Sequence, residues 1–522
     1  MAGTWTALNN QPAKHKPSFN ASTMLLLTDG TVMCQDDAQA QWYKFTPDIF
    51  GNYIFGTWST IQAMNHSRKF FASQVLTDGR VLVVGGEYSS AGNDTDTAEL
   101  YDPEADQWTT VSTRFSWIKG DASSCMLADG RILYGALSTN QSAIYDPVAK
   151  TWTEAGTAFG TVSATKNASN SDEETWVLLP DGTVLTVECA NVGAAEKYVP
   201  SLDKWVSAGS LPVTLVDSAG SEIGPAILLP DGRVFFVGAT GHTAFYTPPS
   251  ANPSQPGTWT AGPDIRDSSK NLYTVIDGPA CLLPNGKVLL VAGKRHPEQN
   301  PDGSTSFWSG PCRFFEFDYT NNSIAELASS NQPATATGDT WNARLLLLPT
   351  GQIMFTNSTN KVYLYNPDGS WKQEWQPTIL NWSQPWLIGG QTYTVEGTQL
   401  NGLSQAVSYG DDYTAATNYP LVRLVFENSG FVFSCRTSGF STMGVATGTA
   451  KHSFQFKVPS SLLTGTGPAV LMISVNGISA KKIQLRVVPS LGQFLRIKGL
   501  DPSKGLRSIR PPITSVRAFM GI

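Results

Sequence analysis

The sequence predicts an all-β protein in which a seven-bladed β-propeller is followed by an immunoglobulin-like β-sandwich. Three observations lead to this prediction: a short turn signal recurs about every 50 residues, a tyrosine–tryptophan pattern follows each turn, and the pattern changes near residue 376. Glycine contributes 47 residues and proline 32, and only 15% of the residues are charged. This composition is typical of a β protein that is rich in turns.

The repeating unit is clearest in residues 72–108. It contains an apolar run, the turn Asp78-Gly79, a second apolar run, the segment AELYDP and a closing strand at Trp108. An Asp-Gly pair between two β-rich runs predicts a hairpin, with positive φ at both turn residues as in a type I′ turn. One sheet of four strands cannot bury both of its faces, so the unit predicts neighbours like itself.

The same turn recurs along the chain with spacings of 49, 51, 52, 50, 54 and 65 residues. Its positions are Asp29-Gly30, Asp78-Gly79, Asp129-Gly130, Asp181-Gly182, Asp231-Gly232, Asn285-Gly286 and Thr350-Gly351. A period near 50 with four strands per unit indicates a propeller of the kelch type. We expect the propeller to cover residues 20–375 and residues 1–19 to supply an N-terminal strand and a linker. The segment GTWTAL near the N-terminus matches an outer strand and is expected to help close the ring.

The second half of each unit repeats a tyrosine, a proline and a tryptophan. The pairs are Tyr101 with Trp108, Tyr145 with Trp152, Tyr198 with Trp205, Tyr246 with Trp259 and Tyr365 with Trp371, with Phe45 and Trp58 as a looser copy. The sixth unit, FFEFDYTNNSI, lacks the proline and the tryptophan. We interpret these aromatic residues as packing between blades.

The chain changes character after the repeats. Residues 376–488 contain alternating strands such as TYTVEGTQL, VRLVFEN and HSFQFKV, which are typical of an immunoglobulin-like domain. Residues 489–522 form a basic tail with six cations against a single acid. Two interpretations of the tail remain open: it docks on a partner protein or a second copy of the chain, or it is a frayed end. Its candidate docking residues are Phe494, Arg496, Arg507, Arg510, Arg517 and Phe519.

Several function classes are disfavoured by the whole sequence. The net charge of −6 argues against a general nucleic-acid binder, and no apolar run is long enough to span a membrane. The N-terminus lacks the apolar core of a secretory signal, which favours a cytoplasmic location or export by an unconventional route. The six cysteines are isolated in the sequence, so we expect buried thiols and neither a disulfide framework nor a zinc site.

Seven kelch-like units followed by an immunoglobulin-like domain resemble the galactose oxidase and glyoxal oxidase superfamily of copper-radical enzymes. The resemblance covers the chain up to about residue 488 and includes lines such as RKFFASQVLTDGRV and WNARLLLLPTGQI. It implies copper on the propeller axis, held by a tyrosine cross-linked to a cysteine, a second tyrosine and two histidines. The positions that match these groups are Ala21, Phe70, Trp341, Asn342 and His452, and only His452 keeps the family's residue.

The lost groups are the ones that copper-radical chemistry needs. Phe70 has no phenol to carry a radical, Ala21 has no thiol for the cross-link, and a tetragonal Cu(II) site requires imidazole or phenolate donors. We therefore expect no copper and a protein that serves binding or assembly. Two alternatives stay open: a divergent copper oxidase of the same superfamily, and an enzyme of another kind that uses carboxylates on the axis for metal-dependent, lyase or hydrolase chemistry.

Other blades carry acids at the level of Phe70. Asp121, Glu173 and Asp277 each lie eight residues before their turn, and Glu222 is adjacent to such a position. Converging carboxylates predict a site for a hard cation such as Ca²⁺, or for a cationic or hydroxyl-rich small molecule such as a carbohydrate; solvated strand-end acids are the alternative. The candidate ligand-binding residues are Lys69, Phe70, Asp121, Glu173, Glu222, Asp277, Trp341, Asn342 and His452.

Overall fold

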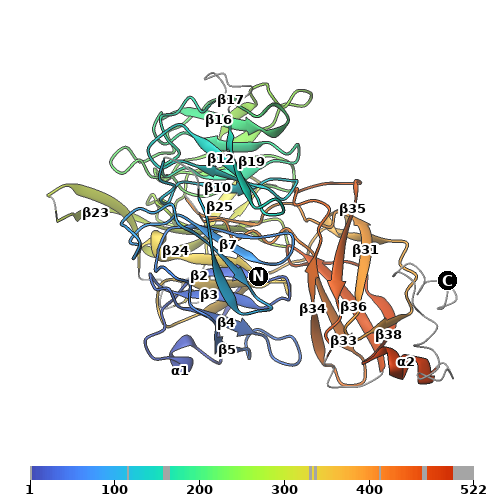
Figure 1. The fold of residues 1–522 in the computed structure, drawn as a ribbon. Coiled ribbons are helices and arrows are strands. Elements are labelled where there is room, and N and C mark those ends of the chain that lie inside the picture. Colours follow the sequence, from blue (N-terminus) through green and yellow to red (C-terminus); the bar gives the residue numbers. More distant parts are fainter. Residues whose placement is uncertain are drawn as a thin grey trace.

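The computed structural model describes residues 3–113, 117–156, 165–301, 303–327, 332–333, 338–410, 413–460 and 467–497. Regular structure in this part of the chain is almost entirely β-strand. The described helices are short: α1 (Pro12–His15), α2 (Leu491–Ile497) and the 3₁₀ segments η3 (Pro200–Leu202), η5 (Thr340–Asn342) and η6 (Gln373–Trp375). None of them has the length and apolar character that a membrane crossing requires. Figure 1 shows a large body of sheets, coloured blue to yellow, beside a smaller orange and red body.

The larger body contains seven antiparallel sheets of four or five strands among the described residues. The first sheet contains β2 (Ala21–Leu26), β3 (Val32–Asp36), β4 (Trp42–Thr46) and β5 (Thr57–Thr60), and the second contains β6 (Ala72–Val75), β7 (Val81–Val84), β8 (Ala98–Asp102) and β9 (Gln107–Val111). The third sheet contains β10 (Ser124–Met126), β11 (Ile132–Gly135), β12 (Ser142–Asp146) and β13 (Thr151–Ala155). The fourth sheet contains β14 (Trp176–Leu178), β15 (Val184–Val187), β16 (Ala194–Val199) and β17 (Lys204–Ser210). The other three are β18 (Ala226–Leu228), β19 (Val234–Val237), β20 (Thr243–Thr247) and β21 (Thr258–Ala261); β22 (Ala280–Leu282), β23 (Val288–Gln299), β24 (Thr305–Asp318) and β25 (Ser323–Glu326), joined by β32 (Val407–Ser408); and β26 (Arg344–Leu347), β27 (Ile353–Thr356) and β28 (Tyr363–Asn366), joined by β1 (Thr4–Ala7).

Successive sheets touch through their first strands, as in a propeller. β10 contacts β14, β14 contacts β18, β18 contacts β22, and β22 contacts β26. β26 also contacts β2, so the last sheet lies against the first sheet of the chain. These first strands are buried along their whole length, which is expected for strands that line the centre of the body.

The recurring turns join the first two strands of every one of the seven sheets, as predicted, but they are not type I′ turns. In the first sheet the Gly30 amide donates to the Leu27 carbonyl at 2.8 Å, and the Leu27 amide donates to the Thr31 carbonyl at 2.8 Å. Only Gly30 has positive φ, at 78°, and Asp29 instead accepts a bond from the Thr31 amide. This is a type I turn followed by a left-handed glycine in a one-residue bulge, and the same hydrogen bonds recur at the other six turns.

The tyrosine–tryptophan pattern corresponds to direct cross-strand pairs between the third and fourth strands. Tyr101 lies opposite Trp108, with ring centroids 5.0 Å apart, and the pairs led by Phe45, Tyr145, Tyr198 and Tyr246 have the same register. The prediction was wrong for Trp371, which follows the last sheet and is 39% exposed. Trp5 of β1 lies opposite Tyr365 instead. The N-terminal strand therefore completes the last sheet, because no local strand is left to do so.

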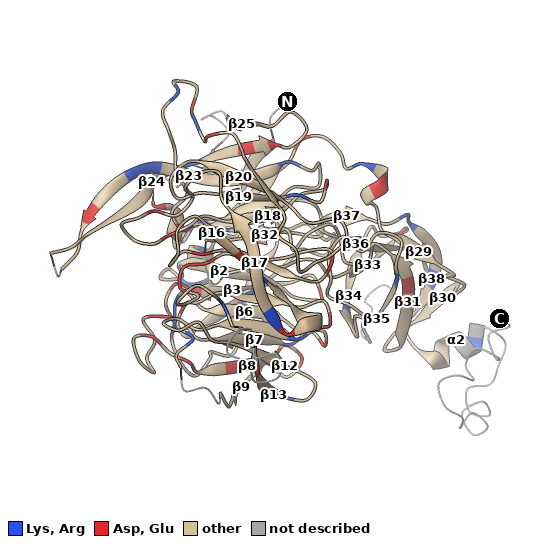
Figure 2. Ribbon diagram, turned by 90° about the horizontal axis from the view of Figure 1, so that it is seen from above, with Lys and Arg blue, Asp and Glu red and all other residues tan. Residues whose placement is uncertain are grey.

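The long sixth spacing corresponds to a hairpin arm. β23 and β24 continue well past the length of their counterparts and pair from Val288–Phe317 out to Gln299–Thr305. The arm projects from the body in Figure 1, and Figure 2 shows basic and acidic segments along it. Its base is held to neighbouring parts of the ring by Arg295, which donates to Asp217 at 2.9 Å, and by His296, which bonds Asp339 at 2.7 Å.

The smaller body is built on a sheet of nine strands. They are β29 (Thr378–Leu380), β30 (Trp386–Ile388), β31 (Thr392–Thr398), β33 (Leu421–Phe426), β34 (Val432–Ser438), β35 (Lys451–Lys457), β36 (Gly467–Val475), β37 (Ile478–Ser479) and β38 (Ile483–Val488). β34 pairs with β33 through its first half and with β35 through its second half. This body covers the turn end of the propeller-like ring: the Thr437, Gly439 and Met443 amides donate to carbonyls of three of the turns.

Residues 404–410 and 413–419 of the smaller body lie in the centre of the ring. Tyr419 donates to the Leu26 carbonyl near the turn end, and Tyr413 donates to the Met24 carbonyl one step further in. β32 then pairs with β22, and the Tyr409 hydroxyl donates to the Trp341 carbonyl at 2.7 Å. The middle of the segment, at Tyr409 and Gly410, therefore lies beside the starts of β14 and β22.

The C-terminal segment departs from the prediction for a docking tail. Residues 491–497 form α2, and Phe494 is buried against Trp386, Ile388 and Val488 of the same chain. Phe494 is therefore unavailable for a partner, because packing on β30 and β38 already removes it from water. Arg496 is exposed at the end of α2. The other predicted tail residues, Arg507, Arg510, Arg517 and Phe519, lie outside the described residues.

Candidate functional site

A cavity of about 470 Å³ lies at the end of the ring opposite the turns. The segments that precede the inner strands β6, β10, β14, β18, β22 and β26 all contribute to it, because the repeat brings equivalent positions of each sheet to one place. Its lining residues are Ala38, Lys69, Phe70, Glu87, Tyr88, Asp121, Glu173, Glu222, Asp277, Trp308 and Trp341. The structure thus brings together seven of the nine predicted binding residues.

The backbone directs these side chains inward in a similar way in three of the sheets. Phe70, Glu173 and Asp277 each lie eight residues before their turn, and each has a left-handed φ of 48°, 57° and 43°. Residues other than glycine rarely adopt this conformation, which costs roughly 1–2 kcal/mol per residue. Its recurrence at the mouth of the cavity is the kind of local strain that gathers at binding and catalytic sites.

Carboxylates form the floor of the cavity. Ligand oxygens of Glu173, Glu222 and Asp277 lie within 4.8 Å of one another, and those of Asp121, Asp172 and Glu173 form a second, overlapping group. Burial, reinforced by the neighbouring Asp277, raises the pKa of Glu222 well above its ordinary value. Negative charges packed this closely in a low-dielectric site require protons or a bound cation.

The sequence analysis missed a second group of acids, of which Glu87 lines the same cavity and Asp94 and Asp172 are its neighbours. Burial and the charge of Asp94 raise the pKa of Glu87 to about 7. Burial, again with Asp94, raises the pKa of Asp172 to about 6. Glu87 and Asp94 belong to the connection between β7 and β8, whose length is not repeated in other units, so counting from the turns could not locate them.

Aromatic rings and a lysine form one wall. The Lys69 ammonium lies 4.5 Å from the centroid of the Trp341 ring and 5.1 Å from that of Phe70, and its Nζ is 3.6 Å from a carboxylate oxygen of Asp37. Trp308, at the base of the hairpin arm, lies 5.9 Å from Trp341 between ring centroids. Burial lowers the pKa of Lys69. The sequence predicted Trp341 but not Trp308, because the arm has no counterpart in other units.

Two predicted residues do not contribute to the cavity. Asn342 lies in η5, next to Trp341, but does not line the cavity. His452 lies on β35 of the smaller body, opposite Gly397, and also lies outside the lining. The prediction for His452 was wrong because the segment of the smaller body that enters the ring is residues 404–419, which contains no histidine. Ala21 is fully buried at the start of β2, where it pairs with Thr359.

The residues at the cavity do not fit copper. Cu(II) in a tetragonal site takes imidazole or phenolate donors, whereas the described lining residues supply carboxylates, one ammonium, aromatic rings and the single phenol of Tyr88. The family's two phenolate positions hold Phe70 and Trp341, which contact each other at 6.1 Å between ring centroids. The donor set instead matches a hard cation, which prefers oxygen ligands.

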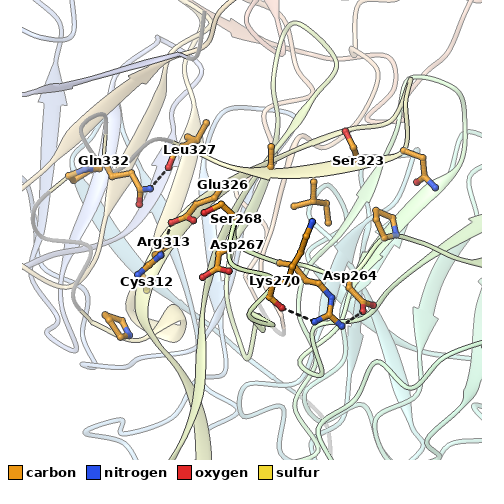
Figure 3. A pocket seen from close by; sticks show the side chains of 17 residues that line it. Asp264, Asp267, Ser268, Lys270, Cys312, Arg313, Ser323, Glu326, Leu327 and Gln332 are labelled. Atoms are coloured by element: carbon orange, nitrogen blue, oxygen red, sulfur yellow. Dashed lines mark hydrogen bonds and ion pairs between the residues drawn. The ribbon is translucent and has the colours of Figure 1, made fainter.

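A larger cavity of about 1270 Å³ lies on the outside of the ring, along β25. Figure 3 shows Arg313 beside Glu326, with which it pairs at 2.9 Å. Arg266, which also lines this cavity, pairs with Asp264 at 2.7 Å. Because these charges are already paired, this cavity has less to offer a ligand. The acidic cavity on the axis is the stronger candidate site.

Comparisons with known proteins agree with this architecture. A model of the kelch motif matches residues 71–114, which contain β6 to β9. Among solved structures, the chain is similar to a fungal alcohol oxidase of the AA5 family in complex with copper, with 14% identity, a TM-score of 0.50, and coverage of 94% of this chain and 99% of that chain. The fold is a galactose oxidase-like kelch propeller.

Further comparisons add no argument about activity. The chain is also similar to a streptogramin B lyase, with 12% identity, a TM-score of 0.47, and coverage of 70% of this chain and 99% of that chain. No curated protein matches the sequence. At such low identities the likeness concerns the fold alone, so the function of the kelch propeller has to be argued from its cavity.

Proposed function

We propose that this protein is a non-catalytic binding protein on a galactose oxidase-like scaffold without the copper site. In this proposal residues 20–375, completed by β1, form a seven-bladed propeller, and residues 376–488 form an immunoglobulin-like domain. The seven sheets with equivalent first hairpins support the first assignment, and the way β34 pairs with both β33 and β35 supports the second. The observation that carries the function is the cavity with a carboxylate floor and an aromatic wall.

The ligand in this proposal is a small cationic or hydroxyl-rich molecule. The Lys69 ammonium lies over the faces of Trp341 and Phe70, which supports a wall that can hold a cation. The buried carboxylates of Asp121, Glu222 and the neighbouring acids accept hydrogen bonds from ammonium or hydroxyl groups. A cavity of about 470 Å³ is within the usual range for small-molecule sites.

Thermal unfolding with a panel of sugars, polyols and organic ammonium ions tests this proposal. We expect at least one of these classes to raise the Tm, since a ligand at a hundredfold its Kd adds about 2.7 kcal/mol to the stability of the folded state. Trp341→Ala should weaken binding about tenfold, whereas the matched control Trp371→Ala, at an exposed tryptophan outside the cavity, should not. If no member of the panel changes the Tm of the wild type, the proposal is wrong.

One observation favours the enzyme alternative. Glu87 lines the cavity and has a pKa of about 7, where a carboxyl group can accept and return a proton at neutral pH. A metal-dependent lyase or hydrolase would use it as the proton acceptor. Product formation from a cavity ligand that is abolished in Glu87→Gln, with ligand binding retained, would favour this second function over simple binding.

The proposal also includes assembly through the basic tail. With Phe494 buried in the chain itself, the candidates that remain are the charged residues from Arg496 onward and Phe519. Removing residues 498–522 leaves α2 in place and should lower the mass in solution, and raising the salt concentration should act in the same direction because exposed charge pairs are screened. Equal masses for the truncated and full-length proteins at low and high salt, with no partner lost, would remove assembly from the proposed function.

A further inference from the structure

The carboxylates on the cavity floor come from three different sheets. Glu173 precedes β14, Glu222 precedes β18 and Asp277 precedes β22, and their ligand oxygens lie within 4.8 Å of one another. Three acids from successive repeats converge on one point because these strands are neighbours around the axis. Each of the three carboxylates contributes one oxygen to this group, so a cation that takes six to eight oxygens would keep positions open for other ligands.

The burial of these acids points to a ligand. Glu222 is 8% exposed and Asp277 is 6% exposed, and both line the cavity. The Glu222 carboxyl group interacts with Asp277 and Glu173, and its Oε2 atom has no other hydrogen-bond partner among the described residues. A buried carboxylate oxygen without a partner is costly, and a positive charge at the point where the three side chains meet would compensate it.

The backbone of Gly410 packs closely against the cluster. Gly410, in the middle of the segment that lies in the centre of the ring, approaches Asp277 so closely that a Cβ atom would lie 2.8 Å from its Oδ1 atom. The Gly410 carbonyl accepts a hydrogen bond from Thr175 at 2.9 Å, which fixes this approach. A larger side chain here would displace the Asp277 carboxylate from the cluster.

We propose that Glu173, Glu222 and Asp277 form a Ca²⁺ site at the floor of the cavity. The donors are carboxylate oxygens, which favour hard cations over Zn²⁺ or copper. The ion would neutralise the cluster and present open coordination positions to hydroxyl groups of a molecule lying against Trp341. The contact between the ion and a ligand rests on the proposed binding function, whereas the Ca²⁺ site itself does not.

Calorimetric titration of chelator-treated protein with CaCl₂ tests the site directly, and Tb³⁺ gives a second readout. We expect one Ca²⁺ per chain, and Tb³⁺ luminescence excited through tryptophan, because Trp308 and Trp341 line the same cavity. Glu222→Gln should weaken Ca²⁺ binding at least roughly tenfold, since even second-shell partners of a metal contribute tenfold or more. Trp341→Phe should lower the luminescence while leaving the calorimetric affinity unchanged.

Glu188→Gln is the matched control. Glu188 is also buried, with an Oε2 atom that has no partner among the described residues, but it lies outside the cavity. The inference is overturned if chelator-treated protein binds no Ca²⁺ at millimolar concentration, or if Glu222→Gln and Glu188→Gln have equal effects. Ligand binding that persists unchanged in chelator refutes the part of the inference in which the ion contacts the ligand, and leaves the proposed function standing. If the protein binds Ca²⁺ but binds no ligand from the panel, the proposed function is wrong and the Ca²⁺ site stands.

Discussion

Replacing Glu87 by glutamine should make the protein more stable at pH 8 and leave its stability at pH 4 nearly unchanged. Burial, together with Asp94, raises the pKa of Glu87 from its ordinary value of 4.5 to about 7 in the folded protein. Below pH 4.5 both states hold the proton, and above pH 7 neither does. Between these values only the unfolded state releases its proton, so the stability of the wild type falls as the pH rises.

The size of this effect follows from the two pKa values. The difference between 4.5 and about 7, at roughly 1.4 kcal/mol for each pH unit, corresponds to about 3 kcal/mol. Glu87 is half-buried rather than fully buried, so solvent screening reduces the expected gain to about 1–2 kcal/mol. Glutamine has nearly the same shape as glutamate and cannot ionise, so the variant should lose the part of the pH dependence that Glu87 contributes and keep the packing.

Urea unfolding of both proteins from pH 4 to pH 8, with a chelator present throughout, measures the difference. We expect the stability of Glu87→Gln relative to the wild type to rise between pH 4.5 and pH 7 and then to level off. Glu154→Gln, at an exposed position on β13, is the control and should follow the wild type at every pH. Parallel curves for Glu87→Gln and the wild type would show that Glu87 titrates normally, and the account of the acidic cavity given above would be wrong.

Three further predictions concern the fold. Trp5→Ala should lower the free energy of unfolding, measured in urea, by roughly 3 kcal/mol, because the Trp5 side chain packs on Tyr365 and Phe314 at 4.9 and 4.5 Å between ring centroids and β1 completes the last sheet. An unchanged free energy of unfolding would show that the last sheet does not need β1. Gly182→Ala should cost about 1 kcal/mol from its φ of 83° alone, and Gly79→Ala should cost more, because its Cβ would also meet Thr28 at 2.7 Å; equal unfolding midpoints would contradict this order. Phe494→Ala should release α2 and increase amide exchange over residues 491–497, whereas unchanged exchange would restore Phe494 as a candidate for docking.

Most of the architecture could be predicted because the signals that define it are local. The seven turns lie within their own hairpins, and a cross-strand pair such as Tyr101 with Trp108 is separated by only a few residues. The mistakes came where local reasoning was not enough. An Asp-Gly pair occurs both in type I′ turns and in type I turns that end in a glycine bulge, so the pair alone did not decide the turn type. The partner of Tyr365 is Trp5, from the other end of the chain, and not the nearby Trp371.

The candidate site was predictable to the extent that it follows the repeat. Counting back from each turn located Phe70, Glu173 and Asp277, because equivalent residues of each sheet occupy the same place around the axis. Glu87 lies on the connection between β7 and β8, and Trp308 lies on the hairpin arm. Because these segments differ in length between units, counting residues from the turns could not locate either side chain. His452 was placed at the site by family resemblance alone, and the register of β35 with β31 holds it in the smaller body.

The repeat also explains how one scaffold can hold different chemistry. The left-handed backbone that directs a side chain to the axis is present at Phe70, an aromatic residue, and at Glu173 and Asp277, which are acids. The surrounding strands, and not the side chain, therefore impose this conformation. A substitution at such a position changes the donor without moving it, and the cavity can pass from phenols and imidazoles to carboxylates while the sheets stay as they are. Under the proposed function, the fold constrains where a ligand would bind, whereas the residue at each repeat position decides which ligand it would be.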